Sequence, residues 1–591
     1  MIPLRRHNGA AALLLGALAG LLGSASPLLA ADERPNVIVI LSDDIGFSDI
    51  GCYGGEINTP NLNRLADGGL RFTQFYNSGR CCPTRASLLT GLYPHQAGMG
   101  WMTSYSGPEG YSGDLNRRCV TMAEVLKTAG YSTYMVGKWH VTPAPTQAQV
   151  DENEIPQHNW PLSRGFDRFY GTIAGAGSYF DPGTLVRDNQ LIAPDHPDSF
   201  YYTDALSDNA SQMIREHQQG EKPFFMYLSY TAAHWPLHAK PADIAKYEGK
   251  YDEGWDKLRE TRLARIKELG LLADDVALAP NVKDWTDADR KQWQSDRMEV
   301  YAAMIDSMDQ GIGRVVQTLR DTGQFDNTLI LYLQDNGACQ EEGRSNKARR
   351  LREDMEPVEA MADDALQLKV VPQYTRAGQP VQWGRGVVPG PPNTYMEVGR
   401  EWANASNTPF RLFKHYVHEG GIATPLIAHW PQGIKRHGEL ETQPGHLIDI
   451  MATLVEVGKA EYPTKFHDGD VEIQPAEGTS LVPAFAGEPL DRKAPIFWEH
   501  EGNRAVRDGD WKLVARGAKG RWQLYNLAND RSELHDLAEE QAGKVTELSG
   551  AWNAWATRAG VLPLTPYWPE PEEKANAQKQ GASPRHAALV R

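Results

Sequence analysis

Four short runs of apolar residues, rich in β-branched and aromatic side chains, interrupt a chain that is otherwise polar or helical in its periodicity. Because each run is continuous rather than alternating, it is typical of a strand buried on both faces of a largely parallel sheet. The runs are residues 36–41, 131–136, 223–230 and 328–333, and a fifth follows at 423–430. Helical periodicity appears at 121–130, 297–319 and 447–458. The pattern predicts an α/β fold with a large, mixed, mostly parallel sheet flanked by helices.

The pattern changes from about residue 494. Short apolar runs separated by glycine-containing turns predict antiparallel strands, and a helix is expected to follow them. The expected strands are 496–499, 503–507, 511–514 and 522–526, and the expected helix is 537–558. We therefore divide the chain into a large domain at 32–493 and a small α+β domain at 494–565, followed by a polar tail at 566–591 that we expect to be disordered.

Two stretches of the large domain lack strand signals. Residues 244–271 are charged and helical in period, and we expect them to form a solvated insertion. Residues 340–407 combine a charged run with a glycine- and proline-rich segment. Loops of that length are usually functional or disordered, so we expect an excursion over the rim of an active site.

The first 31 residues have the features of a signal peptide. Arg5 and Arg6 precede an apolar stretch at 10–22 that is too short to span a bilayer comfortably, and small residues follow it. We expect cleavage near Ala30 or Ala31 and export to the periplasm or the medium. Residues 7–9 lack the apolar continuation of a twin-arginine leader, so the export route stays open. After cleavage we expect no membrane association.

Charge and cysteine content narrow the classes of function. With 60 basic and 76 acidic residues, the formal net charge is −16, which makes general binding to nucleic acid or anionic membranes unfavourable. An anionic substrate is still compatible, because a local cationic pocket outweighs distant, screened charges. The sparse cysteines exclude a disulfide-stapled scaffold, and their pairing does not follow from sequence. They are Cys52, Cys81, Cys82, Cys119 and Cys339.

Polar residues follow each of the four buried runs. Open α/β sheets bind ligands at the carboxyl ends of their strands, so we expect these side chains to converge. They are Asp43 and Asp44, Lys138 and His140, His234, and Asp335 and Asn336. The oxygen donors among them, with no thiolate in the set, favour Ca²⁺, with Mg²⁺ as the alternative, over Zn²⁺. Taken alone, each acidic pair also fits a helix cap or a tight turn.

A candidate nucleophile, Cys81, precedes a predicted helix that ends at Gly91. Pro83 suits a first helical turn. Unpaired N–H groups and the helix dipole favour an anion at that position, either a thiolate or an oxyanion on a modified Cys81.

The segment Cys81-x-Pro83-x-Arg85, followed by Leu89-Thr90-Gly91, resembles the signature of type I sulfatases, which belong to the alkaline phosphatase superfamily. The Lys138-Trp139-His140 element and the Lys414-x-x-x-x-Glu419 element resemble further parts of that family. Residues 399–421 resemble bacterial arylsulfatases in particular. The resemblance implies that a maturation enzyme oxidises Cys81 to formylglycine, an aldehyde that hydrates to a gem-diol. It also implies that residues 32–493 form the catalytic domain.

The resemblance further implies hydrolysis of a sulfate monoester, of an aryl or carbohydrate alcohol, through a covalent sulfated intermediate. Residue 81 would ligate the metal together with Asp43, Asp44, Asp335 and Asn336. Asp335 would accept the proton of the attacking hydroxyl, and Lys138 and Lys414 would neutralise the sulfuryl oxygens. His234, with or without Lys414, would protonate the leaving group. His140 would deprotonate the remaining hydroxyl, and Arg85 would hold the nucleophile's turn.

Three other readings fit parts of the same pattern. The chain could hydrolyse phosphate or phosphonate monoesters, as other members of that superfamily do. It could bind sulfated glycans without catalysis if Cys81 were left unconverted. It could also be a thiol hydrolase that uses Cys81 and His140. The leaving group, the identity of the metal and the oligomeric state are not set by the sequence.

Overall fold

The computed structural model describes residues 33–103, 108–218, 222–343, 355–466 and 469–564. The described residues from Arg34 to Leu564 form one compact unit. The predicted leader at 1–31 and the predicted disordered tail at 566–591 lie outside the described residues. The domain boundary between residues 493 and 494 stays a prediction. Within the described ranges, no helix combines the length and the apolar character needed to cross a bilayer.

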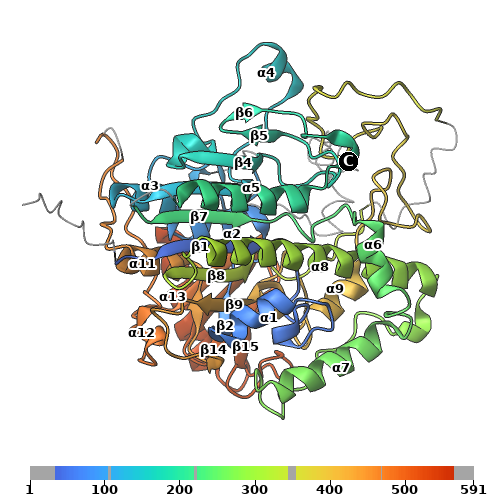
Figure 1. Ribbon diagram of the computed structural model, residues 1–591. Helices are drawn as coiled ribbons and strands as arrows, with labels where there is room; N and C mark the ends of the chain where they lie inside the picture. The colour runs from blue at the N-terminus through green and yellow to red at the C-terminus, as the bar shows by residue number, and fades with distance from the viewer. Residues whose placement is uncertain (1–32, 104–107, 219–221, 344–354, 467–468, 565–591) are drawn as a thin grey trace, which may run out of the picture. The chain divides into compact units, whose positions relative to one another are not determined.

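A large sheet forms the centre of the fold (Figure 1). Its order is β10-β2-β9-β8-β1-β7-β3-β4-β5-β6, and β11 pairs with β2. The central strands, each parallel to its neighbour, are β8 (Thr328–Gln334), β1 (Asn36–Ser42), β7 (Phe224–Ser229), β3 (Ser132–Lys138) and β4 (Arg168–Thr172). The four buried runs are therefore adjacent parallel strands, which confirms the predicted fold class.

The outer strands make the sheet mixed. The fifth apolar run is β9 (Ala423–His429), which runs antiparallel to both β8 and β2 (Leu70–Tyr76). Neither β2 nor β4 was predicted from the sequence. The short edge strands are β10 (Glu439–Glu441), β11 (Gly445–His446), β5 (Leu185–Arg187) and β6 (Gln190–Leu191).

Helices cover both faces of the sheet, which explains why its central strands are apolar throughout. Ile38 and Ile40 of β1 belong to a cluster with α1 (Pro60–Asp67), α5 (Tyr202–His217) and α8 (Lys291–Asp321). Val37 and Val39 belong to a second cluster with α2 (Cys81–Thr90), α3 (Met122–Thr128) and α11 (Ile448–Val457). The other described α-helices of the large domain are α4 (Gln147–Asp151), α6 (Pro241–Ile244), α7 (Gly254–Glu268), α9 (Arg400–Ser406), α10 (Glu419–Ile422) and α12 (Val482–Phe485).

The prediction of a solvated insertion at 244–271 is wrong for one face of α7. Arg262 is 1% exposed, and its guanidinium binds Asp49 Oδ1 at 2.6 Å and Glu56 Oε2 at 2.8 Å. Trp255 and Ile266 on the same helix are also buried. The sequence pattern did not reveal this buried face, because an arginine that is buried in ion pairs looks the same in the sequence as an arginine exposed to solvent.

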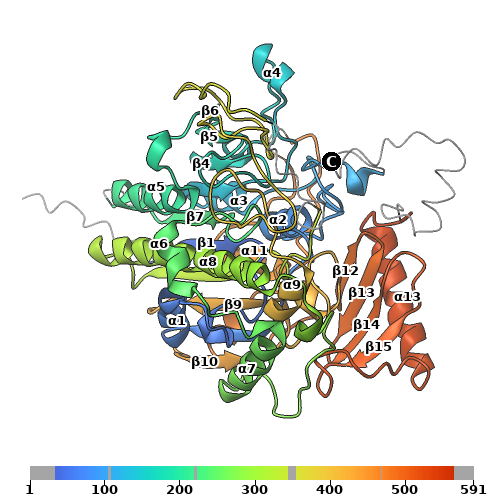
Figure 2. The same ribbon diagram turned by 90° about the vertical axis from the view of Figure 1, so that its right-hand side faces the viewer.

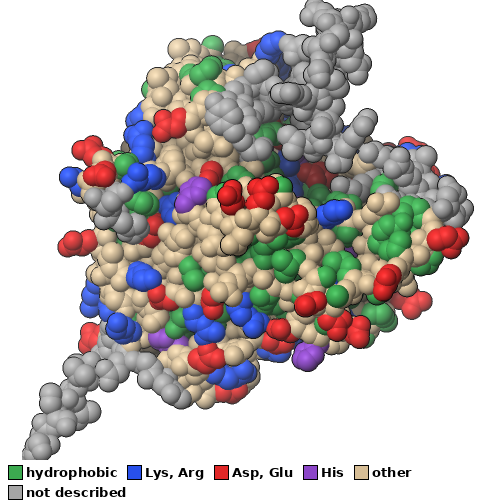
Figure 3. Space-filling model, turned by 90° about the horizontal axis from the view of Figure 1, so that it is seen from above, with side chains coloured by type: hydrophobic (Ala, Val, Ile, Leu, Met, Phe, Trp, Pro, Cys, Tyr) green, Lys and Arg blue, Asp and Glu red, His purple; other side chains and the backbone are tan. Residues whose placement is uncertain are grey.

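The C-terminal part contains the predicted antiparallel sheet, with α13 (Ala542–Arg558) beside it (Figure 2). Its strands are β12 (Ile496–His500), β13 (Asn503–Asp508), β14 (Trp511–Ala515) and β15 (Gln523–Asn526). The helix begins later than expected, because Leu537 donates its N–H to Leu524 of β15 at 2.8 Å. On the face seen in Figure 3, acidic and basic side chains are interspersed.

Candidate active site

The polar residues that follow the four central strands meet at the carboxyl edge of the sheet. Arg85 of α2 joins all four of these strand ends. Its guanidinium lies 3.2 Å from Asp43 Oδ2 and 3.0 Å from Asp335 Oδ2, and it donates to the Lys138 carbonyl oxygen at 3.1 Å. It also donates to Ser229 Oγ at the end of β7. All of these groups are buried, so α2 is fixed to the sheet by a fully desolvated ionic contact.

Cys81 is the first residue of α2, with Arg80 as the N-cap in extended conformation. Thr84 Oγ1 donates to the Asp335 carbonyl oxygen at 2.6 Å, which ties the first turn of the helix to the end of β8. At the other end, Gly91 takes φ = 68° and donates its N–H to Ser87, as predicted for a glycine stop. The thiol of Cys81 is 1% exposed and lies at the positive end of the helix dipole.

The oxygen donors of β1 and β8 form a compact set. Asn336 donates from Nδ2 to Asp44 Oδ1 at 2.7 Å, and the Asp44 N–H donates to Asp335 Oδ1 at 3.2 Å. Asp43 Oδ1 and Asn336 Oδ1 are buried and have no hydrogen-bond partner. Burial and the neighbouring Asp335 carboxylate raise the pKa of Asp43 to about 7. Orphaned oxygens and crowded, desolvated carboxylates are what a divalent hard cation would satisfy, so the residues fit the predicted metal.

Two lysines also contact this acidic set. Lys138, the last residue of β3, binds Asp43 Oδ2, and Lys414 Nζ lies 2.8 Å from Asp44 Oδ1. Lys414 comes from the loop before α10, and its N–H donates to the Ala338 carbonyl oxygen at 3.2 Å. That bond attaches the lysine loop to the segment that follows β8.

His140 lies beside Cys81. Its φ angle is 55°, so the chain turns at this residue and does not continue extended from β3. The ligand atoms of Cys81, Cys82 and His140 lie within 4.8 Å of one another. A Cβ on Gly175 would be 2.0 Å from His140 Cε1, so a glycine is required where the ring packs. Burial lowers the pKa of His140 to about 4, which keeps the ring neutral near pH 7.

His234 approaches the site from the end of β7. Its Nδ1 pairs with the Trp235 carbonyl oxygen at 2.8 Å, which leaves Nε2 facing Asp44 Oδ2 at 3.5 Å. Burial lowers the pKa of this imidazole. The nearby His238 is not part of the site, because its Nε2 pairs with the Thr394 carbonyl oxygen at 2.7 Å.

The two neighbouring thiols have different acidities. A hydrogen bond from Cys82 holds the pKa of Cys81 well below its usual value, against the effect of burial, and Lys138 adds to the shift. Burial raises the pKa of Cys82. All five cysteines are free thiols in this structure.

A second cluster, which we call the Arg80 cluster, was missed by the sequence analysis. It consists of Arg80, Glu341, His415 and Glu501. Arg80 precedes Cys81, and His415 follows Lys414, so two of its members adjoin predicted site residues. Glu341 and Glu501 belong to no recognised sequence motif, and only the tertiary structure brings them next to Arg80. His415, His500 and Glu501 have ligand atoms close enough together to hold a metal ion. Arg80 lies against the ring of His415, and its positive charge disfavours a cation there.

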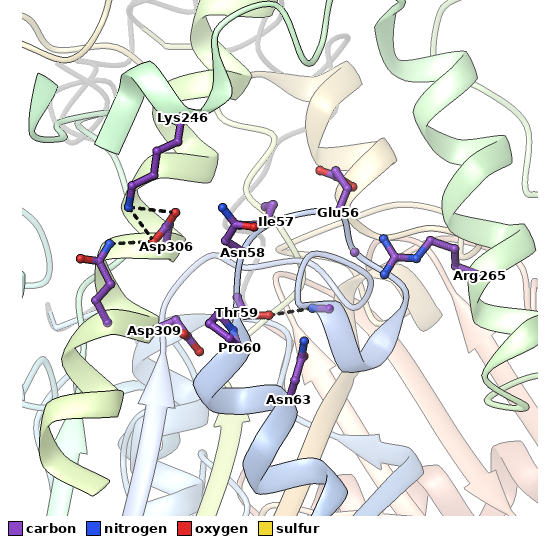
Figure 4. Close-up of a pocket in the computed structure, with 13 residues that line it drawn as sticks. Glu56, Ile57, Asn58, Thr59, Pro60, Asn63, Lys246, Arg265, Asp306 and Asp309 are labelled. Atoms are coloured by element: carbon purple, nitrogen blue, oxygen red, sulfur yellow. Dashed lines mark hydrogen bonds and ion pairs between the residues drawn. The ribbon is translucent and has the colours of Figure 1, made fainter. Parts of the chain in front are cut away.

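A separate pocket of about 440 Å³ opens between α1, α7 and α8 (Figure 4). None of the predicted site residues lines it. Its carboxylates already have partners: Asp309 accepts the N–H groups of Asn61 and Leu62 at 3.1 and 2.8 Å, and Asp306 binds Lys246 at 3.2 Å. Asp309 thus acts as a cap for the first turn of α1.

Comparisons with known proteins agree on one family. The family model described as Sulfatase matches residues 35–460. An uncharacterized sulfatase of Schizosaccharomyces pombe is 33% identical over 567 residues, covering 90% of this chain and 95% of that protein. An arylsulfatase of Klebsiella aerogenes is 35% identical over 447 residues, covering 72% of this chain and 87% of that protein. The crystal structure of Ps i-CgsB in complex with k-i-k-neocarrahexaose superposes with a TM-score of 0.61 at 24% identity, covering 94% of this chain and 100% of that one, which shows a shared fold.

Proposed function

This chain belongs to the sulfatase family and is a sulfuric ester hydrolase, and we propose that it cleaves sulfate monoesters with a nucleophile derived from Cys81. The observation that carries the mechanism is the contact of Arg85 with both Asp43 and Asp335. Through that contact, the helix that begins at Cys81 and the acidic strand ends form one desolvated site. A sulfate ester is a small anion, and Lys138 and Lys414 supply the cationic groups for its oxygens.

We assign the metal to Asp43, Asp44, Asp335, Asn336 and residue 81, with Ca²⁺ favoured and Mg²⁺ as the alternative. The unpartnered oxygens of Asp43 and Asn336 support this assignment. When bound, a divalent cation stabilises negative charge on the sulfuryl oxygens and on the attacking hydroxyl. Because residue 81 would offer a hydroxyl oxygen in its hydrated formylglycine form, the set contains no thiolate, and a hard cation suits it better than zinc.

The side chain of residue 81 is proposed to act as formylglycine in its hydrated form, made by a maturation enzyme. One hydroxyl attacks sulfur and passes its proton to Asp335, a bond forms from that oxygen to sulfur, and the ester S–O bond breaks. His234 gives a proton to the departing alcohol or phenol, and Lys414 stabilises the charge on the leaving oxygen. The sulfuryl group is then carried covalently on residue 81.

His140 completes the cycle. It accepts the proton of the second hydroxyl on residue 81, the C–O bond to the sulfate breaks, and inorganic sulfate leaves as the aldehyde re-forms. Water then hydrates the aldehyde. The neutral state of His140, which follows from its pKa of about 4, supports its role as a base.

The remaining proposals concern the context of the reaction. We propose export to the periplasm or the medium, on the basis of the leader at 1–31. The leaving group is an aryl alcohol or a carbohydrate, and the relation to an arylsulfatase supports the first. A phosphate or phosphonate monoester hydrolase stays the alternative to test against.

Two measurements test the proposal. Intact mass of the peptide that contains Cys81 should be about 18 Da lower than that of the encoded sequence, the loss expected when a thiol is converted to an aldehyde. Rates on 4-nitrophenyl sulfate, 4-nitrophenyl phosphate and an aryl phosphonate monoester should favour the sulfate. An unmodified thiol in a protein with full activity contradicts the mechanism, and faster turnover of the phosphorus esters contradicts the substrate class.

A further inference from the structure

The turn between β12 and β13 has an unusual residue at its tip. His500 pairs with Asn503, so Glu501 and Gly502 form a two-residue hairpin loop. Their φ angles are 53° and 78°, the left-handed pair of a type I′ turn. Asparagine, aspartate or glycine normally occupies the first of these positions, because other side chains are strained there. The turn itself therefore does not favour a glutamate, and the contacts of its side chain explain its presence.

The side chain of Glu501 reaches across to the active-site loops. Its exposure is 8%, and its carboxylate lies 3.2 Å from Arg80 Nη1 and 2.8 Å from His415 Nδ1. Glu341 completes the Arg80 cluster from the segment after β8, at 3.4 Å from Arg80 and 3.2 Å from His415 Nε2. Trp235, which follows His234, donates its indole N–H to Glu341 at 2.8 Å.

Backbone bonds tie the same residues together. The His415 N–H donates to the Gly79 carbonyl oxygen at 2.9 Å, so the lysine loop and the segment before Cys81 are joined directly. His415 takes φ = 80°, a strained conformation for a histidine, and Asn503 of β13 donates to its carbonyl oxygen at 3.0 Å. A strained backbone conformation persists only where surrounding contacts stabilise it, and Asn503 of the C-terminal sheet provides one of these contacts to His415.

We propose that Glu501 is a positioning residue: by holding Arg80 and His415, the C-terminal sheet sets the placement of Cys81 and Lys414 relative to each other. The inference rests on the proposed function, because it concerns the nucleophile and the group that stabilises the leaving oxygen. The role requires a carboxylate, because its two oxygens accept hydrogen bonds from the Arg80 guanidinium and the His415 imidazole at once. Such charge-assisted hydrogen bonds are stronger than those of a neutral side chain.

The test compares full-length proteins that carry single substitutions in the hairpin turns of the C-terminal sheet. Glu501→Asn suits the left-handed position better than glutamate but lacks the charge and the reach. Glu501→Gln keeps the length and removes the charge. Asp510→Asn is the matched control, because Asp510 lies in the next hairpin of the same sheet with an exposed side chain. Each variant is assayed on phenyl sulfate, a poor leaving group, and 4-nitrophenyl sulfate, a good one.

We expect Glu501→Asn to remain folded, because relief of turn strain offsets part of the lost ion pairing. It should lose at least about tenfold more kcat/KM on phenyl sulfate than on 4-nitrophenyl sulfate, because the poor leaving group depends more on stabilisation of its oxygen. Glu501→Gln should fall between Glu501→Asn and wild type, and Asp510→Asn should match wild type. An equal loss on both substrates, or none, overturns the inference. If wild type hydrolyses neither sulfate, the proposed aryl leaving group fails instead.

Discussion

Lys414 and Asp44, 370 residues apart, form a buried ion pair in which Nζ lies 2.8 Å from Oδ1 and 2.9 Å from Oδ2. Burial by itself would lower the pKa of the lysine, but Asp44 and the carboxylate of Glu341 hold it well above its usual range. Lys414 therefore stays charged through the physiological range. A permanent, desolvated cation beside the proposed metal ligands is suited to stabilising charge on the substrate rather than to donating protons.

Replacing Lys414 with methionine should lower kcat/KM for 4-nitrophenyl sulfate by about 10²- to 10³-fold, the usual effect of losing one preorganised electrostatic group. The exposed Lys435, changed in the same way, serves as the control and should leave the rate unchanged. A Lys414→Met enzyme within a few-fold of wild type would show that this lysine does not contact the reacting group.

Removal of metal should lower both activity and thermal stability. A ligand bound only by the folded state stabilises it by RT ln(1 + [L]/Kd), or about 2.7 kcal/mol at one hundred times Kd. Chelation of the wild type should therefore lower Tm, and Ca²⁺ should restore it. Asp43→Asn should lose turnover by orders of magnitude and no longer respond to chelator in its Tm. Unchanged activity of a chelated wild type would refute the metal assignment.

The His140→Ala variant should accumulate sulfated residue 81, because the neutral imidazole is the proposed base for release of sulfate. The measurement is the mass of the residue 81 peptide quenched during turnover of 4-nitrophenyl sulfate. A single burst of 4-nitrophenol is expected, followed by slow turnover. Detection of unmodified formylglycine alone under these conditions would assign His140 another role.

Gly175→Ala should reproduce much of the His140 defect without touching a reactive group. The added methyl carbon would lie 2.0 Å from His140 Cε1, so the ring must leave its present position beside Cys81. Gly177→Ala is a matched control two residues away, where the nearest atom is the Gly183 backbone nitrogen at 3.1 Å. We expect kcat to fall at least about tenfold for the first and to change little for the second. Equal rates for the two variants would contradict the requirement for a fixed ring.

Acid should unfold the protein partly through Glu419. This fully buried carboxylate lies 2.8 Å from Lys512 and 3.1 Å from Arg531, and these cations outweigh burial and lower its pKa from 4.5 to about 2. A depressed pKa stabilises the fold above the unfolded value, so roughly 3 kcal/mol should be lost as pH falls from about 4.5 to about 2. Urea unfolding of Glu419→Gln should show a flatter stability–pH curve over that window. Parallel curves for the two proteins would exclude this contribution.

The sequence by itself determined the central sheet and the location of the candidate site. Continuous apolar runs such as residues 36–41 identify the central strands, because a strand that is buried on both faces has no position that must be polar. Polar residues at their carboxyl ends, among them Asp43 and Asp335, had to converge once the strands were parallel neighbours. The antiparallel C-terminal sheet was also predictable, since its turns carry glycine at short, regular intervals.

Only the tertiary structure decided which charges pair. The burial of Arg262, the bridge from Arg85 to Asp43 and Asp335, and the reach of Glu501 to Arg80 all join residues distant in sequence. Local periodicity records whether a side chain is polar, not whether a partner from another element will desolvate it. Ion pairing of this kind depends on the packing of whole layers, which exists only after the chain has folded.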